Sequence, residues 1–161
     1  MIKYITIIFY LIFLNVSAAE YLKFNSIDQK FPNHPEVLVE ISFPKKTAGK
    51  LPLIITQHGS TRDGKQIQDG ATDEYSTRII KEGNKQGFAV AAIDAFYKKP
   101  VTANEKTRFP DALNYANELR KILIEDERFD KERFFYTGFS YGAQQVLKTI
   151  GAPYNKKNPN A

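Results

Sequence analysis

One serine in the chain stands between two glycines, in the order Gly138, Phe139, Ser140, Tyr141, Gly142. A serine hydroxyl attacks acyl groups when a tight turn exposes its oxygen and a base takes its proton. Glycines on either side allow close backbone contacts that a Cβ would block. The spacing therefore makes Ser140 the candidate nucleophile of an acyl-transfer reaction.

The segments on either side of this serine change from strand to helix character within five residues. Residues 134–137 are apolar and aromatic, which favours a strand, and residues 143–148 are helix formers. The same pattern also fits an ordinary glycine-rich connection in which Ser140 caps the following helix. The rest of the chain has to decide between these two interpretations.

Other kinds of catalytic centre find little support. The 161 residues contain no cysteine, which excludes a thiol nucleophile and thiolate metal sites. The two histidines, His34 and His58, do not form a His-Glu-x-x-His pattern, so we expect no metal and no cofactor.

The N-terminus has the pattern of a secretory signal peptide. Lys3 precedes an apolar run over residues 4–14, and small residues follow up to Ala19. The run is shorter than the roughly 20 residues that a membrane span needs, although a retained anchor is the alternative. We expect residues 1–19 to be removed, leaving an exported protein, periplasmic or secreted, with no stable membrane anchor.

Removal of residues 1–19 lowers the formal net charge from +5 to +4. These charges are spread along the chain, which argues against a nucleic-acid partner. Residues 20–161 suffice for one domain and are too few for two.

Apolar segments and amphipathic helices alternate along this domain. Residues 21–27 and 37–43 predict two leading strands, antiparallel at a sheet edge, and residues 51–57 and 88–94 predict buried strands. One helix is predicted from about residue 72 to Gly83 or Gly87. A second begins near Pro110, and its apolar stripe consists of Ala112, Ala116, Leu119 and Leu123.

This order predicts an α/β fold, a mostly parallel sheet with helices on both faces. Reactive loops of such sheets gather at the carboxyl ends of the strands. His58, Asp94 and Ser140 each lie at the end of a predicted strand, so we expect their loops to lie close together.

Three of these segments resemble the α/β-hydrolase superfamily, and within it the dienelactone hydrolase family and neighbouring secreted esterases. They are the strand that ends in His58-Gly59, the strand over residues 87–96, and residues 136–143 around Ser140. The resemblance covers residues 51–150. It implies that residues 20–161 are the N-terminal portion of a single α/β-hydrolase domain.

The resemblance also implies a role for individual residues. Ser140 would be the nucleophile, and the backbone N–H groups of Tyr141 and Ser60 would form the oxyanion hole. The side chain of Tyr141 would then be free to contact substrate. His58 resembles a structural loop residue, and Asp94, which precedes the serine, would order neighbouring loops.

The C-terminal strands, the acid and the histidine of the family's catalytic triad have no counterpart after Ile150. We therefore expect an N-terminal fragment of a longer hydrolase, with little turnover, poor solubility and the strand before Ser140 at an open sheet edge. A folded binding protein without activity, or a partner chain that completes the site, are the alternatives.

The sequence as a whole predicts a serine hydrolase that cleaves a small-molecule ester or lactone through an acyl-enzyme. A catalytically inactive α/β-hydrolase-like binding module and a fragment of a prolyl-oligopeptidase-like serine peptidase are the other readings. The oligomeric state and the acyl and alcohol specificity cannot be read from the residues.

Overall fold

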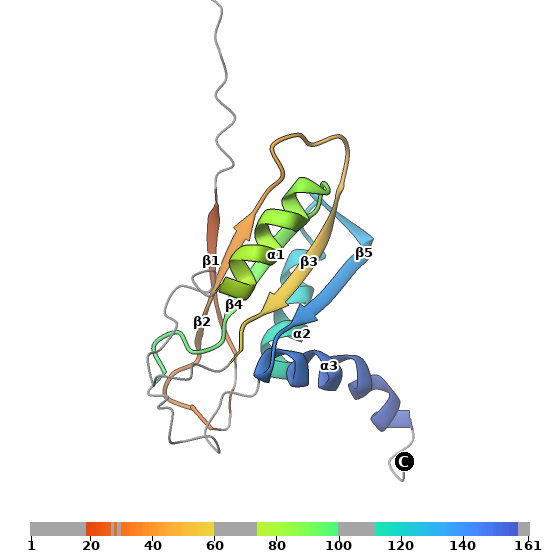
Figure 1. Cartoon of the computed structure of the whole chain (residues 1–161). Coiled ribbons are helices and arrows are strands. Elements are labelled where there is room, and N and C mark those ends of the chain that lie inside the picture. The colour runs from red at the N-terminus through yellow and green to blue at the C-terminus, as the bar shows by residue number, and fades with distance from the viewer. Residues whose placement is uncertain (1–18, 27, 29, 60–73, 100–111, 158–161) are drawn as a thin grey trace, which may run out of the picture.

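The structure is a computed structural model that describes residues 19–157 apart from residues 27, 29, 60–73 and 100–111 (Figure 1). Within these residues five strands and three helices follow one another along the chain. They are β1 (Glu20–Asn25), β2 (Glu36–Ser42), β3 (Leu51–Gln57), α1 (Glu74–Lys85), β4 (Ala89–Asp94), α2 (Ala112–Leu123), β5 (Phe129–Gly138) and α3 (Tyr141–Lys157).

The strands form one sheet in the order β1-β2-β4-β3-β5. β2 pairs antiparallel with β1 and β4, whereas β3 pairs parallel with β4 and β5. Four strands therefore share one direction and β2 alone is reversed. The predicted α/β class, the mostly parallel sheet and the two antiparallel leading strands are confirmed.

The connections from β3 explain why helices cover both faces. The chain leaves β3 through α1 to β4 on one side, then crosses back through α2 to β5 on the other side of β3. Right-handed crossovers in opposite directions place their helices on opposite faces. In Figure 1, α1 lies in front of the sheet and α2 behind it.

The larger part of the core lies between the sheet and α2. Alternate residues of β3, such as Leu53 and Ile55, are fully buried there against Leu119 and Leu123 of α2. This alternation follows from the period of two in a strand. The predicted helix stripe is confirmed at Ala116, Leu119 and Leu123, while the side chain of Ala112 lies outside the described residues.

On the other face, α1 approaches the sheet closely at Gly83. A Cβ on Gly83 would lie 2.7 Å from Cγ2 of Val90, so only glycine fits at this distance. The helix ends with Gly87 at a φ of 87°, where Phe88 N–H donates to Gly83 O and Gly87 N–H donates to Asn84 O. This is a Schellman motif, so Gly87 marks the predicted end of the helix and Gly83 lies within it.

The strand β5 is longer than predicted and lies at one edge of the described sheet. It begins at Phe129, before the strand predicted from Phe134, and its pairing with β3 is irregular between these two residues. The side chain of Phe135 is 48% exposed. The open edge expected for this strand is therefore present among the described residues, and the apolar face of the strand is partly uncovered.

Candidate functional site

The turn between β5 and α3 holds Ser140 in a conformation that non-glycine residues seldom adopt. Its φ is 51°, in the left-handed region, and its side chain is exposed. A non-glycine residue there costs about 1–2 kcal/mol. Strain of this kind persists only where surrounding contacts enforce it, and it concentrates at functional sites.

Close backbone packing at the two flanking glycines, Gly138 and Gly142, enforces the turn. A Cβ on Gly142 would lie 2.3 Å from the carbonyl oxygen of Gln57, and a Cβ on Gly138 would lie 2.4 Å from the carbonyl carbon of Gly142. Both distances are far below van der Waals contact. The start of α3 therefore rests directly on the end of β3, which side chains at these positions would prevent.

The hydrogen bonds of the turn begin the helix without the serine side chain. Gly142 N–H donates to Phe139 O at 2.9 Å, and Gln144 N–H donates to Ser140 O at 3.2 Å. Among the described residues, the Ser140 hydroxyl accepts no hydrogen bond from the first turn of α3. The alternative in which this hydroxyl caps the helix therefore has no support in the structure.

The loop after β3 meets this turn, as the positions at strand ends predicted. Phe139 N–H donates to Gln57 O at 3.2 Å, and a Cβ on Gly59 would lie 3.4 Å from Cβ of Ser140. Ser60, the predicted second oxyanion donor, follows immediately but lies outside the described residues. Only the segment that leads to it can be placed beside Ser140.

Tyr141 opens α3, and its two functional groups lie in different surroundings. Its N–H belongs to the first turn of a helix, where N–H groups point outward from the helix end. Its side chain is buried and packs on Phe96, with ring centroids 5.6 Å apart. The expectation that this side chain is free to contact substrate is wrong, because the loop after β4 covers it.

His58 is fully buried, and both of its ring nitrogens contact the backbone. Ala95 N–H donates to Nε2 at 3.1 Å, so Nε2 accepts and the ring proton is on Nδ1, which donates to Gly59 O at 2.7 Å. The imidazole thus joins the loop after β3 to the loop after β4. This is a structural arrangement, and neither of these two hydrogen bonds is directed at Ser140.

Asp94 is also fully buried, at the end of β4. Its Oδ1 accepts a hydrogen bond from Phe96 N–H at 2.9 Å, the geometry of an Asx-turn. Oδ1 also lies 3.8 Å from Nε2 of His58. Asp94 therefore orders the loop that covers Tyr141, as the sequence predicted.

The chain is similar to solved structures of hydrolases. An ester hydrolase from the metagenome of Lake Arreo, in complex with a bipyridine phosphonate derivative, is 18% identical, with a TM-score of 0.63 over 88% of this chain and 41% of its own. A bacterial heroin esterase is 20% identical, with a TM-score of 0.59 over 87% and 40% of the two chains. A Klebsiella pneumoniae subsp. pneumoniae protein described as a dienelactone hydrolase is 17% identical, with a TM-score of 0.52 over 78% and 51%.

The chain has the α/β-hydrolase fold. It spans between 33% and 55% of the length of the solved structures it matches, so the fold is present in part. No protein-family model and no curated protein matches the sequence. At these identities the similarity establishes the fold alone. We call the turn over residues 138–142, which joins β5 to α3, the elbow.

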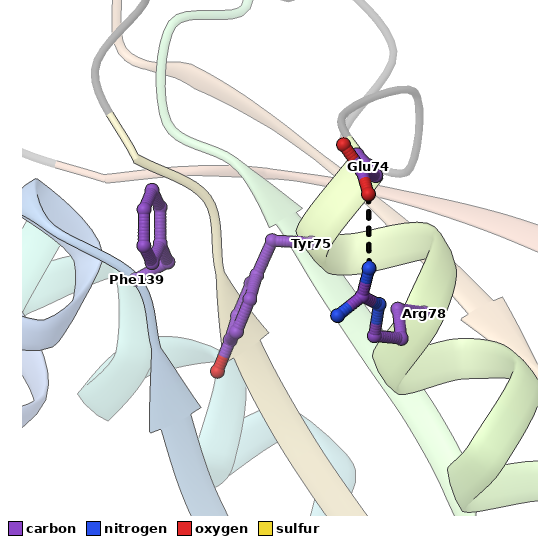
Figure 2. Close-up of a pocket in the computed structure, with 4 residues that line it drawn as sticks. All are labelled: Glu74, Tyr75, Arg78 and Phe139. Atoms are coloured by element: carbon purple, nitrogen blue, oxygen red, sulfur yellow. Dashed lines mark hydrogen bonds and ion pairs between the residues drawn. The ribbon is translucent and has the colours of Figure 1, made fainter.

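A pocket of about 330 Å³ opens beside the elbow (Figure 2). Phe139 from the elbow and Tyr75 from α1 form one wall, with ring centroids 5.5 Å apart, and the ion pair of Glu74 with Arg78 lies beside them. The Tyr75 hydroxyl is 2.6 Å from Oγ1 of Thr137, which fixes the ring. Sequence reasoning missed this wall, because only the crossover brings α1 next to β5.

A second feature that the sequence did not indicate is a buried lysine after β4. Lys99 is 1% exposed, and its Nζ donates to Glu36 O at 2.9 Å and lies 5.0 Å from the ring centre of Tyr115. The Tyr115 hydroxyl in turn donates to Oδ2 of buried Asp28 at 2.7 Å. Because Lys99 follows Lys98 in a polar segment, the sequence predicts that its side chain is exposed.

A cluster of metal-ligating side chains and a membrane-spanning helix are both absent from the described residues. These residues contain no group of three or more His, Asp or Glu residues arranged to hold a metal ion. Among the same residues, no helix is both long enough and apolar enough to cross a bilayer.

Gly142→Ala tests whether close backbone approach sets the elbow. In a helix interior, alanine in place of glycine raises stability by up to about 1 kcal/mol. Here the contact of the new Cβ with Gln57 O should outweigh this gain and lower the free energy of unfolding by about 3 kcal/mol. Urea denaturation measures the change. Gly49→Ala is the matched control, because Gly49 has a φ of 74° in open space and should cost only about 1–2 kcal/mol. A Gly142→Ala variant as stable as the wild type would refute the proposed contact.

Lys99 should make stability depend on pH in the alkaline range. Burial lowers the pKa of Lys99 from 10.5 to about 8, against the opposing effect of Asp28, Asp94 and Glu36. Between pH 8 and 10.5 the Lys99 side chain is deprotonated in the folded chain but protonated in the unfolded chain. The free energy of unfolding should therefore rise with pH across this window, by up to about 3 kcal/mol.

Urea denaturation at pH 7.5, 9 and 10.5 measures this effect. Lys99→Met keeps the length of the side chain and removes the titrating group, so its stability should lack the rise. Identical pH profiles for the variant and the wild type would contradict the assignment to Lys99.

Proposed function

We propose that this protein is a serine hydrolase that cleaves a small-molecule ester or lactone through an acyl-enzyme. The observation that carries the proposal is the strained, exposed Ser140, with a φ of 51°, at the turn between the strand and the helix. Backbone strain that does not stabilise the fold, such as this positive φ, is typical of functional sites. The hydrolases among similar structures support the same reaction class.

Ser140 would attack the acyl carbon through its Oγ. The bond between this carbon and the ester oxygen then breaks, and the alcohol leaves with the proton that the serine hydroxyl released. Water attacks the acyl-enzyme in a second step, which frees the acid and returns the proton to Ser140. A lactone follows the same course, with acid and alcohol on one product.

The negative oxygen of the tetrahedral intermediate needs hydrogen-bond donors. We assign this role to the N–H groups of Tyr141 and Ser60, each worth on the order of 3 kcal/mol in an oxyanion hole. The first-turn position of Tyr141 and the contact of Gly59 with the elbow support this assignment. Both donors are backbone groups, so the buried side chain of Tyr141 does not interfere.

The base that takes the serine proton is not assigned to a described residue. His58 is unsuitable, because it is fully buried and holds Gly59 and Ala95 through its ring nitrogens. The same observation favours the second candidate function, a binding module with the hydrolase fold and no catalysis. In that case the pocket at Tyr75 and Phe139 would bind a ligand without cleaving it.

Labelling with a fluorophosphonate separates the two functions. The full-length protein as its host produces it should form a covalent adduct at Ser140, identified by mass spectrometry of its peptides. Ser140→Ala should remove the label completely, whereas Thr77→Ala, at an exposed hydroxyl on α1, should retain it. A folded full-length protein that takes up no label would establish the binding module instead.

We also propose that the protein is exported, either to the periplasm or to the medium. The first strand begins at Glu20, directly after the predicted cleavage site, which agrees with a mature chain that starts there. N-terminal sequencing of protein from the periplasmic and medium fractions should read Glu20-Tyr21-Leu22. Recovery of uncleaved protein in the membrane fraction would favour a retained anchor.

A further inference from the structure

A larger pocket, of about 520 Å³, lies at the end of the sheet opposite to Ser140. The elbow adjoins the pairing of Gln57 with Gly138, whereas this pocket lies where β2 ends at Ser42 and α1 ends before Gly87. Figure 1 shows the loop between β2 and β3 passing the C-terminal end of α1 at the top, with α3 beginning at the bottom. The pocket is therefore separate from the proposed catalytic turn.

The wall of this pocket is apolar and fixed in place. Phe43 and Pro44 supply the apolar surface, and the Phe43 ring stacks on Phe129 with centroids 6.2 Å apart. The guanidinium carbon of Arg128 lies 4.8 Å from the centre of the Phe43 ring. Beside this surface, Asn84 Nδ2 donates to Ser42 Oγ at 2.6 Å and so joins α1 to β2.

The rim carries positive charge. The described residues that line the pocket include four lysines, which are Lys45, Lys46, Lys81 and Lys85. No acidic residue is among these described lining residues. Lys81 and Lys85 are four residues apart on α1, so they project from the same side of the helix. Lys85 contacts Glu82 at 3.4 Å, but both side chains are more than half exposed, and such pairs bind weakly.

We propose that this pocket binds a free single-chain amphiphile with an anionic head, of the fatty-acid carboxylate class. Its hydrocarbon chain would lie on Phe43 and Pro44, and its head would face the lysines. The apolar surface favours the hydrocarbon chain, which a simple polyanion lacks. The lysines favour the anionic head, which a neutral lipid lacks. A volume of 520 Å³ is within the range of small-molecule sites.

Isothermal titration calorimetry of the full chain with laurate, below its micelle-forming concentration, tests the proposal. Laurate should bind with one-to-one stoichiometry, and its affinity should fall when salt is added. Dodecyl maltoside and dodecyltrimethylammonium, which have the same chain, and acetate, which lacks it, should each bind at least about tenfold more weakly. Decanoate should bind about tenfold more weakly than laurate, because each buried methylene contributes roughly a fourfold change.

A charge-reversed pair identifies the site. Lys81→Glu with Lys85→Glu should weaken laurate binding at least about tenfold, from two weak ion contacts and the repulsion that replaces them. Lys121→Glu with Lys148→Glu makes the same change in net charge on exposed positions of α2 and α3, and should leave the affinity unchanged. Melting curves confirm that both variants fold.

Three results would overturn the proposal. They are equal affinity for laurate and dodecyl maltoside, equal weakening by both charge-reversed pairs, and binding to anionic phospholipid vesicles without binding to monomeric laurate. The last would indicate a membrane-surface site instead. Because none of these measurements involves Ser140, they are independent of the proposed hydrolase activity.

Discussion

The arrangement of the site depends on the close approach of α3 to the end of β3. Gly142 lies against the carbonyl groups of Gln57 and His58 with no room for a Cβ. This approach requires β5 to pair directly with β3, which the crossover through α2 provides. The chain between Gly138 and Tyr141 then has to turn so sharply that Ser140 takes a positive φ.

Buried polar groups hold the surrounding loops in register with this contact. His58 joins the loop after β3 to Ala95, Asp94 orders the loop after β4 through Phe96, and the ring of Phe96 packs on Tyr141. The ends of β3, β4 and β5 are therefore one connected unit, in which each loop limits the movement of the next. Low polarity around these groups strengthens their hydrogen bonds and makes each costly to break.

Features that follow from local pattern were predictable from the sequence, whereas features that follow from distant contacts were not. Apolar runs and the stripe at Ala116 and Leu119 predicted the sheet and α2, because burial sets their period. The start of β5 at Phe129 and the burial of Lys99 were missed, because an irregular pairing and burial by distant segments leave no periodic signal. Tyr141 was misjudged for the same reason, since Phe96 covers it from the loop after β4.

We propose that the elbow presents Ser140 Oγ to an acyl group and the Tyr141 N–H to the resulting oxyanion. A crystal structure of the full-length protein after reaction with a phosphonate ester tests it most directly. We expect phosphorus bonded to Ser140 Oγ, with a phosphonyl oxygen about 2.7–3.1 Å from the Tyr141 nitrogen. Phosphorus on another residue, or a phosphonyl oxygen directed into solvent away from Tyr141, would contradict it.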